Sequence, residues 1–144
     1  MGYIESNLLP DERVVHTATL HWLIFGKALC VAVAGLVIVA FEPTMGTLVV
    51  LVGAIMAVPP LVARKTSEFG VTTRRVIIKV GFLQRRTLEL LLRQVEAISV
   101  DQTIMGRMFN YGTITLSGTG GVREVFDHIA SPLEFRRQIQ SQTT

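Results

Sequence analysis

The sequence predicts an α+β protein, in which an amino-terminal transmembrane helical hairpin precedes a small antiparallel β-barrel or sandwich capped by a carboxyl-terminal α-helix. Three observations support this fold class. Two long apolar segments, residues 22–41 and 45–63, are separated only by Glu42, Pro43 and Thr44. Short segments rich in β-branched residues and bounded by glycines follow, which is typical of antiparallel sheets. The chain ends with the capping signals and the spacing of an amphipathic helix.

Residues 1–21 are expected to form an amino-terminal arm in the cytoplasm, with residues 13–19 as a candidate extra strand. This arm carries Glu5, Asp11 and Glu12 but only one basic residue, Arg13. A secretory signal peptide instead starts with basic residues and has a single short apolar stretch before its cleavage site. The acidic arm and the second apolar segment therefore argue against a cleaved signal peptide.

Residues 22–63 are predicted to form the two-helix transmembrane hairpin, with helices at 22–41 and 45–63. About twenty apolar residues, at ~1.5 Å rise per residue, make ~30 Å of helix, which matches the hydrocarbon core of a bilayer. The only charge within the helices is Lys27. Its ammonium can extend to the headgroups, and an intramembrane ion pair is the alternative.

Small residues and prolines predict how the two helices pack and where the second one bends. Ala28 and Ala32, and Gly53 and Ala57, lie four residues apart, a spacing that lets helix backbones approach closely within the hairpin. The pair at 59–60 is Pro-Pro, which should kink the second helix or end its regular hydrogen bonding.

Basic residues predict the orientation of the hairpin. Arg64 and Lys65 follow the second apolar segment directly, whereas the connector between the helices carries only Glu42. Further basic residues follow within about twenty positions of that point: they are Arg74, Arg75, Lys79, Arg85 and Arg86. Because positive charge accumulates on the cytoplasmic side, both termini of this multi-pass chain are expected in the cytoplasm.

Residues 64–144 are predicted to form one small cytoplasmic domain. A short β-branched segment closed by Gly81 indicates a strand at 75–80, and alternation of apolar and polar residues indicates strands at 87–92 and 113–117. Further strands are expected at 95–100 and 122–128. Gly81 and Phe82 are expected to turn between the first two strands. About seven strands are expected in all, and these five together with the candidate strand at 13–19 are the ones located in the sequence. The helix that follows should begin with a capping box, Ser131 to Glu134, with Pro132 in its first turn. Its apolar side is expected to comprise Leu133, Phe135 and Ile139, with Arg136 and Arg137 facing water.

Chemical motifs do not indicate an enzyme. The glycines at 118–121 lack the Lys-Ser or Lys-Thr pair of a phosphate-binding loop, and no serine lies in a nucleophile-elbow pattern. His16 and His21 have no cysteine or carboxylate at ligand spacing, and Cys30 is the only cysteine. We therefore expect no catalytic residue, metal, cofactor or small-molecule substrate.

The basic residues predict a surface that faces the membrane or an anion. From Arg64 onward the chain has twelve Lys or Arg residues and seven Asp or Glu, a net charge of +5. Each cation close to an anionic leaflet contributes about 1 kcal/mol of attraction. The candidate residues are Arg64, Lys65, Arg74, Arg75, Arg85 and Arg86. A hairpin between the strands at 75–80 and 87–92 is expected to bring the two arginine pairs together. Nucleic acid is not expected, because this patch lacks interleaved aromatic residues.

Several segments resemble a known family. They are residues 67–77 (SEFGVTTRRVI), 95–102 (VEAISVDQ), 106–107 (GR), 112–114 (GTI), 118–121 (GTGG) and 8–15 (LLPDERVV), the last with Asp11 where glycine is more usual. Together they are similar to the bacterial pleckstrin-homology-like (PH-like) domains, formerly DUF304. The resemblance implies a partly open β-barrel capped by the terminal helix, in a protein of the bacterial cytoplasmic (inner) membrane. It implies no enzymatic activity and carries over no binding residues.

The expected function is that of a membrane-anchored PH-like interaction or scaffold module. Its partners would be the lipid bilayer and either another membrane protein or further copies of itself. The alternative is a sensor of anionic lipid headgroups, which would use the basic surface.

Overall fold

A computed structural model describes residues 2–81 and 84–144 and shows two compact units in an α+β chain. The first unit, called here the domain, consists of Met1–His21 and Thr66–Thr144. The second, called here the helical unit, consists of Trp22–Lys65. The amino-terminal segment therefore belongs to the domain, although the helical unit separates it from the rest of the domain in the sequence.

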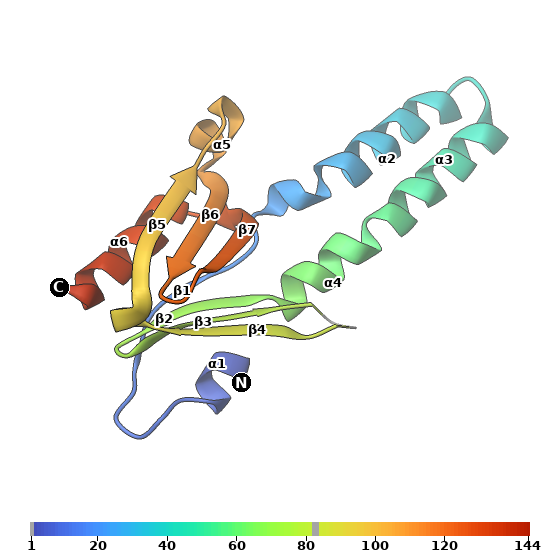
Figure 1. Ribbon diagram of the computed structural model, residues 1–144. Coiled ribbons are helices and arrows are strands. Elements are labelled where there is room, and N and C mark those ends of the chain that lie inside the picture. Colours follow the sequence, from blue (N-terminus) through green and yellow to red (C-terminus); the bar gives the residue numbers. More distant parts are fainter. Residues whose placement is uncertain (1, 82–83) are drawn as a thin grey trace. The chain divides into compact units, whose positions relative to one another are not determined.

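The helical unit contains the two long apolar helices that the sequence predicts (Figure 1). Its elements are η1 (Trp22–Phe25), α2 (Gly26–Val39), α3 (Pro43–Met56) and α4 (Val58–Thr66). Taken together, Trp22–Val39 and Pro43–Thr66 are long and apolar enough to cross a bilayer by length and composition. Pro43 occupies the first turn of α3, where its missing N–H is not needed.

Glycines let α2 and α3 lie almost backbone to backbone. A Cβ atom added at Gly46 would come within 2.3 Å of the Val39 nitrogen, and one at Gly53 within 2.8 Å of the Ala32 nitrogen. The sequence predicted the contribution of Ala32 and Gly53 but not that of Gly46. The second helix is interrupted at Ala57, between α3 and α4. Pro59 and Pro60 explain this break, because neither has an N–H to donate to the carbonyl four residues earlier.

The domain is built from two antiparallel sheets. Sheet A has the order β1 (Val14–Ala18), β2 (Glu68–Thr72), β3 (Arg75–Val80) and β4 (Arg86–Leu91). Sheet B has the order β5 (Val95–Asp101), β6 (Tyr111–Gly118) and β7 (Val122–Ala130). The domain also contains three short helical elements, α1 (Tyr3–Ser6), η2 (Leu92–Gln94) and α5 (Ile104–Phe109). A bridge between Leu20 and Ile129 joins the end of β1 to β7 and partly closes the barrel.

The strands agree with those expected from the sequence except at β2. The five expected strands overlap β3 to β7, and β1 lies within the candidate segment 13–19. β2 was not predicted because residues 69–72 are buried on both faces, so no alternation is visible. Gly70 also interrupts its β-branched character; a Cβ there would lie 2.6 Å from the Ile4 Cδ1 atom of α1.

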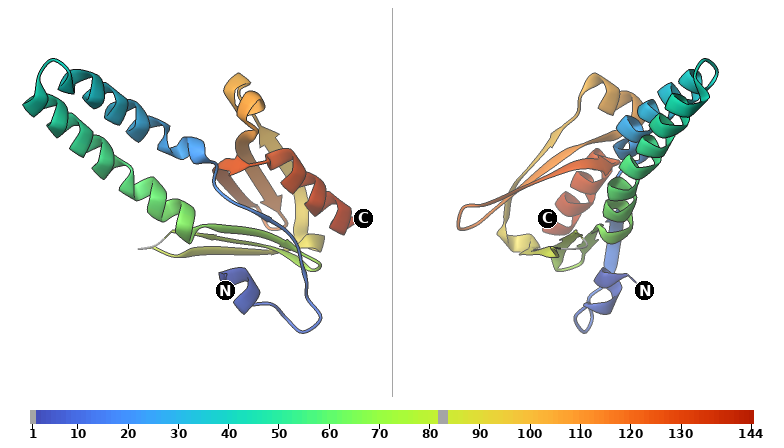
Figure 2. Two further views of the ribbon diagram at one scale, coloured as in Figure 1. Left: turned by 180° about the vertical axis from the view of Figure 1, so that it is seen from behind. Right: turned by 90° about the vertical axis from the view of Figure 1, so that its right-hand side faces the viewer.

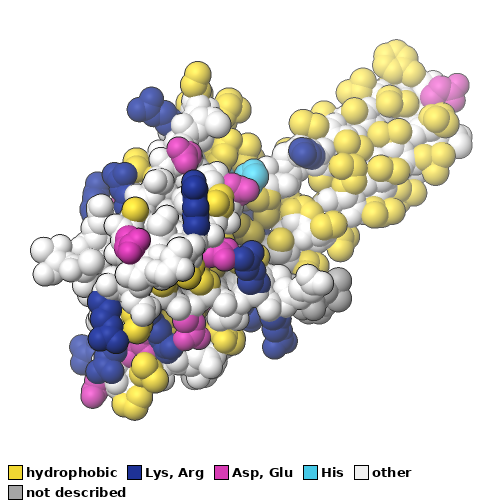
Figure 3. Space-filling model, in the orientation of Figure 1, with side chains coloured by type: hydrophobic (Ala, Val, Ile, Leu, Met, Phe, Trp, Pro, Cys, Tyr) yellow, Lys and Arg dark blue, Asp and Glu magenta, His cyan; other side chains and the backbone are white. Residues whose placement is uncertain are grey.

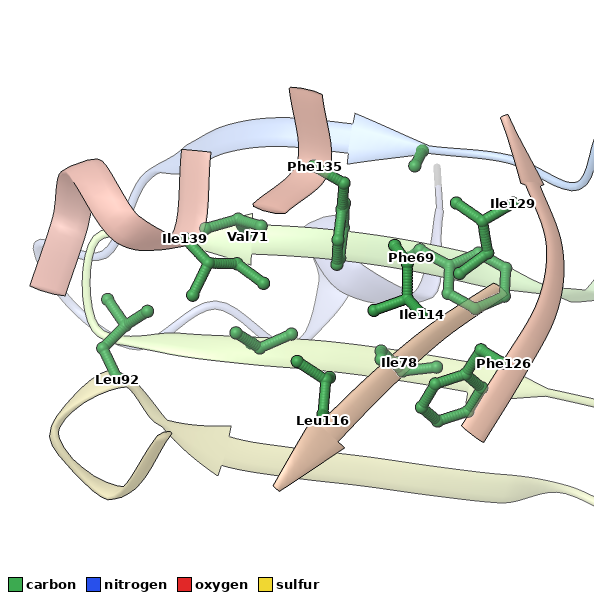
Figure 4. Close-up of a cluster of buried hydrophobic side chains, with 12 residues drawn as sticks. Phe69, Val71, Ile78, Leu92, Ile114, Leu116, Phe126, Ile129, Phe135 and Ile139 are labelled. Atoms are coloured by element: carbon green, nitrogen blue, oxygen red, sulfur yellow. The ribbon is translucent and has the colours of Figure 1, made fainter. Parts of the chain in front are cut away.

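The core lies between the two sheets and α6 (Pro132–Thr143), as Figures 2 and 4 show. The rings of Phe69 from sheet A and Phe126 from sheet B meet edge to face, with centroids 5.8 Å apart. Phe135 and Ile139 of α6 are fully buried against both sheets (Figure 4). Other buried members of this core are Val71, Val76, Ile78, Leu92, Ile114, Leu116 and Ile129.

Two expectations for α6 are wrong. Ser131 precedes the helix in a left-handed conformation (φ 51°), and its side chain forms no capping bond with the helix backbone. Its hydroxyl instead accepts a hydrogen bond from the Asn110 side chain, while Glu134 pairs with Arg137. Leu133 is 43% exposed rather than buried. Ser131, which connects β7 to α6, adopts a left-handed backbone conformation that the capping pattern in the sequence does not predict.

Candidate functional site

The chain leaves the domain for the helical unit at His21 and returns to it at Thr66. Both connections lie at one end of sheet A, because antiparallel pairing sets Ala18, near the end of β1, opposite Phe69, near the start of β2. We call this end of the domain, which carries His21 and Thr66, the tether end. The opposite end of sheet A, at the turn from β2 to β3, is the far end.

The register of sheet A places the predicted basic residues at opposite ends. Lys79 lies opposite Glu68 at the tether end, and Arg86 pairs with Val80 at the same end. Arg75 pairs with Leu91 at the far end. Five residue steps along β3, at ~3.3 Å each, separate the two ends by about 17 Å.

The expectation that a hairpin brings the two arginine pairs together is therefore wrong. Each pair stands at the start of its strand, and the starts of antiparallel neighbours lie at opposite ends of the hairpin. Of the turn expected at Gly81 and Phe82, Gly81 has φ 96°, a conformation that suits glycine. Phe82 lies outside the described residues.

Arg75 is held in a buried ion pair with Glu12. The Glu12 side chain is fully buried, and its Oε1 atom accepts hydrogen bonds from Thr72 Oγ1 at 2.6 Å and from Arg75 Nε at 3.0 Å. Its Oε2 atom accepts from Arg75 Nη2 at 3.0 Å and from the Leu9 backbone N–H at 2.8 Å. Arg75 also pairs with Glu89 on β4.

These contacts decide the protonation state of the pair. Burial by itself raises the pKa of Glu12, but hydrogen bonds from Arg75, Leu9 and Thr72, together with the Arg75 charge, lower it further than burial raises it. The hydrogen bond to Glu12 correspondingly raises the pKa of Arg75. The pair fastens the amino-terminal segment to sheet A, so Arg75 has a structural role here.

The other predicted cations are more exposed. Arg86 forms a surface ion pair with Glu124 of β7, with its side chain 70% exposed, and Arg85 beside it is exposed. Arg64 and Lys65 are exposed in the last turn of α4, within the helical unit. Arg74 lines an open groove of about 510 Å³ at the far end, together with Arg93, Leu9 and Thr143. Within the domain, the geometry thus places Arg74 and Arg75 at one end of sheet A and Arg85 and Arg86 at the other.

Two features of the tether end were not identified from the sequence. The Lys79 ammonium lies 4.8 Å from the centroid of the Tyr3 ring, which sits on α1. The short helix α5 carries exposed apolar side chains, at Ile104, Met105, Met108 and Phe109. A signal for α5 exists in retrospect: Thr103 is a favourable N-cap residue, and Asn110 tolerates the left-handed conformation that ends the helix.

The described residues contain no group of three or more His, Cys, Asp or Glu side chains that could hold a metal ion. The imidazoles of His21 and His128 instead flank the Tyr111 ring, with centroid distances of 5.1 Å and 6.0 Å. This arrangement is aromatic packing at the point where the chain leaves the domain.

Comparisons with known proteins identify the family. A solved structure to which part of the chain is similar is that of a DUF1696 family protein with a pleckstrin-homology domain from Shewanella loihica PV-4. It is 13% identical in sequence, with a TM-score of 0.43, and the match covers 54% of this chain and 71% of that one. No curated protein matches the chain. The family model described as Bacterial PH domain matches residues 20–143, which include both the apolar helices and most of the domain, so the chain belongs to the bacterial PH domain family.

Proposed function

We propose that this protein is a non-catalytic, membrane-anchored interaction module of the bacterial PH domain family. In this proposal, the helical unit spans the bacterial cytoplasmic membrane, and the domain assembles with further copies of itself or with another membrane protein. The observation that carries the anchor is the surface of the helical unit, because its large apolar side chains are exposed.

Figure 3 shows one face of this surface, on which hydrophobic side chains cover most of the two helices. Leu36 is 62% exposed, Ile55 is 70% exposed and Phe41 is 82% exposed. Leaving a large apolar side chain in water rather than burying it costs ~1.5–3 kcal/mol. Lipid removes this cost for every such side chain on α2 and α3. The backbone N–H and C=O groups of both helices are already hydrogen-bonded within the helices, so lipid leaves them satisfied.

The orientation proposed for the anchor follows from the charges at its ends. Arg64 and Lys65 occupy the last turn of α4, whereas Glu42 lies at the turn between α2 and α3. Positive charge accumulates on the cytoplasmic side of bacterial membranes, so the α4 end of the hairpin and the domain would lie in the cytoplasm.

Open strand edges support the interaction role of the domain. In the two sheets, β1 and β7 are joined through Leu20 and Ile129, whereas β4 and β5 each have one neighbouring strand. An edge strand presents unpaired N–H and C=O groups, which can accept a strand from another chain. On β5 the side chains of Glu96, Ser99 and Asp101 are exposed, which gives this edge a polar, accessible surface.

Photo-crosslinking in intact membranes tests both parts of this proposal. A photoreactive residue at Ser99 on the β5 edge should capture a protein, and one at Thr119 in the turn after β6 serves as the control. The full chain should remain with the membranes after extraction at alkaline pH. Release by this extraction would contradict the anchor. Retention without a crosslink specific to Ser99 would contradict the interaction role of this edge.

The second candidate function, sensing of anionic headgroups, is favoured by the cations of the tether end. Lys79, Arg85 and Arg86 lie where the chain joins the helical unit, and each cation near an anionic leaflet contributes about 1 kcal/mol. When the full chain is held in anionic vesicles, contact with the lipid should protect the domain from added protease. Replacing Arg85 and Arg86 by Gln should reduce this protection, whereas Arg74→Gln at the far end should not. Selectivity for one headgroup that persists at high salt would favour sensing over simple attraction.

A further inference from the structure

We propose that α5 (Ile104–Phe109) inserts its exposed apolar side chains into the membrane interface. This inference rests on the proposed anchoring of the helical unit, and it assigns a lipid-contacting site to the domain itself. The occupant of this site is the headgroup and upper acyl region of the leaflet on the cytoplasmic side.

The first support is the exposure of apolar side chains that the fold holds outward. Ile104 is 81% exposed and Met108 is 71% exposed, and these two residues lie one turn apart on α5. Met105 is 50% exposed and Phe109 is 39% exposed, again one turn apart. Contiguous exposed apolar residues of this size mark an interaction surface more often than an ordinary water-facing helix.

The second support is that α5 is a fixed element. The Thr103 hydroxyl accepts a hydrogen bond from the Gly106 N–H at 3.1 Å, which caps the start of the helix. The Gln102 side chain donates a hydrogen bond to the Tyr111 carbonyl at 3.0 Å, which links the segment before α5 to the first residue of β6 after it. A Cβ at Gly106 would lie 2.6 Å from the Tyr111 oxygen, so this side of α5 packs against the base of β6. The apolar side chains therefore project from a rigid base.

The third support is the position of α5 along the chain and in the domain. Tyr111 begins β6 two residues after α5 ends, and its ring stacks on that of His21 with centroids 5.1 Å apart. His21 is also fixed by its backbone N–H, which donates to the His128 carbonyl at 2.7 Å. The next residue, Trp22, begins the first apolar helix. The covalent bond between His21 and Trp22 thus keeps α5, which is ~9 Å long, close to the place where the chain would enter the bilayer.

Charge favours lipid over a protein as the occupant. Arg107 lies within α5, and the helix itself contains no Asp or Glu, although Asp101 at the end of β5 precedes it closely. A short segment with apolar residues and a cation, free of acidic residues, is suited to the interface of an anionic leaflet, where apolar side chains reach the acyl boundary. A second copy packed through its own α5 would bring a second Arg107 to the contact with no acidic residue of α5 to pair with it, whereas an anionic leaflet complements this charge.

Fluorescence quenching in vesicles of zwitterionic and anionic lipids tests the proposal on the full chain. Cys30→Ala removes the only native cysteine, and a single cysteine is then introduced at Met105 and labelled with an environment-sensitive fluorophore. Two further single-cysteine variants serve as references. Leu36→Cys reports on α2. Thr119→Cys follows Gly118 at the other end of β6, and that end lies about 23 Å from Tyr111 at ~3.3 Å per residue.

We expect the fluorophore at position 105 to emit at shorter wavelength in vesicles and to be quenched by lipids brominated near the ester end of the acyl chain. Iodide dissolved in the water should quench it little. The Thr119 label should show the opposite pattern. If iodide quenches the Met105 label while brominated lipid quenches the Leu36 label, the inference is overturned and the proposed anchor still stands. A Met105 label protected from iodide but not quenched by lipid would show a protein as the occupant and also overturn it. Absence of lipid quenching at Leu36 would remove the proposed anchor, and the inference with it.

Discussion

Replacing Glu12 by Gln should unfold the domain at a much lower denaturant concentration than the native chain requires. The substitution keeps the size of the side chain but removes the charge that compensates Arg75, whose side chain is only 12% exposed. It also weakens the acceptor for Thr72 Oγ1 and for the Leu9 N–H. Removing one partner of a buried ion pair costs ~3–5 kcal/mol, because the remaining charge stays buried without compensation.

The magnitude lies near the lower end of that range because Arg75 keeps two other partners. It still pairs with Glu89 on β4, and it donates to the Asn7 carbonyl at 2.7 Å. We therefore expect a loss of about 3 kcal/mol, a large share of the ~5–15 kcal/mol by which small domains are stable. With the urea dependence usual for a domain of this size, the midpoint should fall by about 1 to 3 M.

Pulse proteolysis in urea on the full chain in detergent micelles measures this change, because it follows the domain while the helical unit stays in the micelle. Glu5→Gln is the matched control, since it makes the same change at an exposed position on α1 and should shift the midpoint little. Adding Arg75→Met to Glu12→Gln should recover part of the loss, because it removes the uncompensated charge. Equal midpoints for Glu12→Gln and Glu5→Gln would refute the structural role of this ion pair.

The remaining predictions concern pH, the core, the helix contact and the topology. The folded domain lowers the pKa of Glu12, so this residue stabilises the fold above its ordinary pKa of 4.5 and stops doing so as pH falls toward the folded pKa. The free energy of unfolding of Glu12→Gln should therefore depend less on pH below about 5, and acid titration of unfolding measures this difference. Ile114→Asp together with Leu116→Asp should abolish the folded domain, since both side chains are at most 1% exposed and each loss costs ~2–5 kcal/mol, whereas Val125→Asp, 53% exposed on the next strand, should retain the native circular dichroism. Gly46→Leu should separate α2 from α3 and lower the thermal midpoint of helix loss, and Gly26→Leu, where a Cβ meets nothing within 4 Å, should not; equal effects would argue against the close contact. In a Cys30→Ala background, a cysteine at Thr44 should react with an impermeant reagent outside intact cells and one at Thr143 only after permeabilisation, and the reverse pattern would contradict the orientation.

The sequence alone was sufficient for the elements whose pattern is local. Apolar composition, interrupted only by Lys27, located the two long helices, and Pro59 and Pro60 located the break in the second one. β-branched composition located β3, whose residues 76–78 are all buried, and alternation located β4 and β6. The combined short motifs also identified the family, which the match over residues 20–143 confirms.

Tertiary structure decided the features that depend on residues far apart in the chain. Glu12 and Arg75 are 63 positions apart, so no spacing rule could show that this arginine belongs to the interior rather than to a basic surface. Strand register, set by the turns, placed Arg75 and Arg86 at opposite ends of one hairpin. Packing against α1 hid β2, and the left-handed Ser131 replaced the expected capping box. Local composition fixes which segments are helical, extended or apolar, but the pairing of distant segments determines which charges are buried and which apolar side chains, such as Ile104, stay exposed.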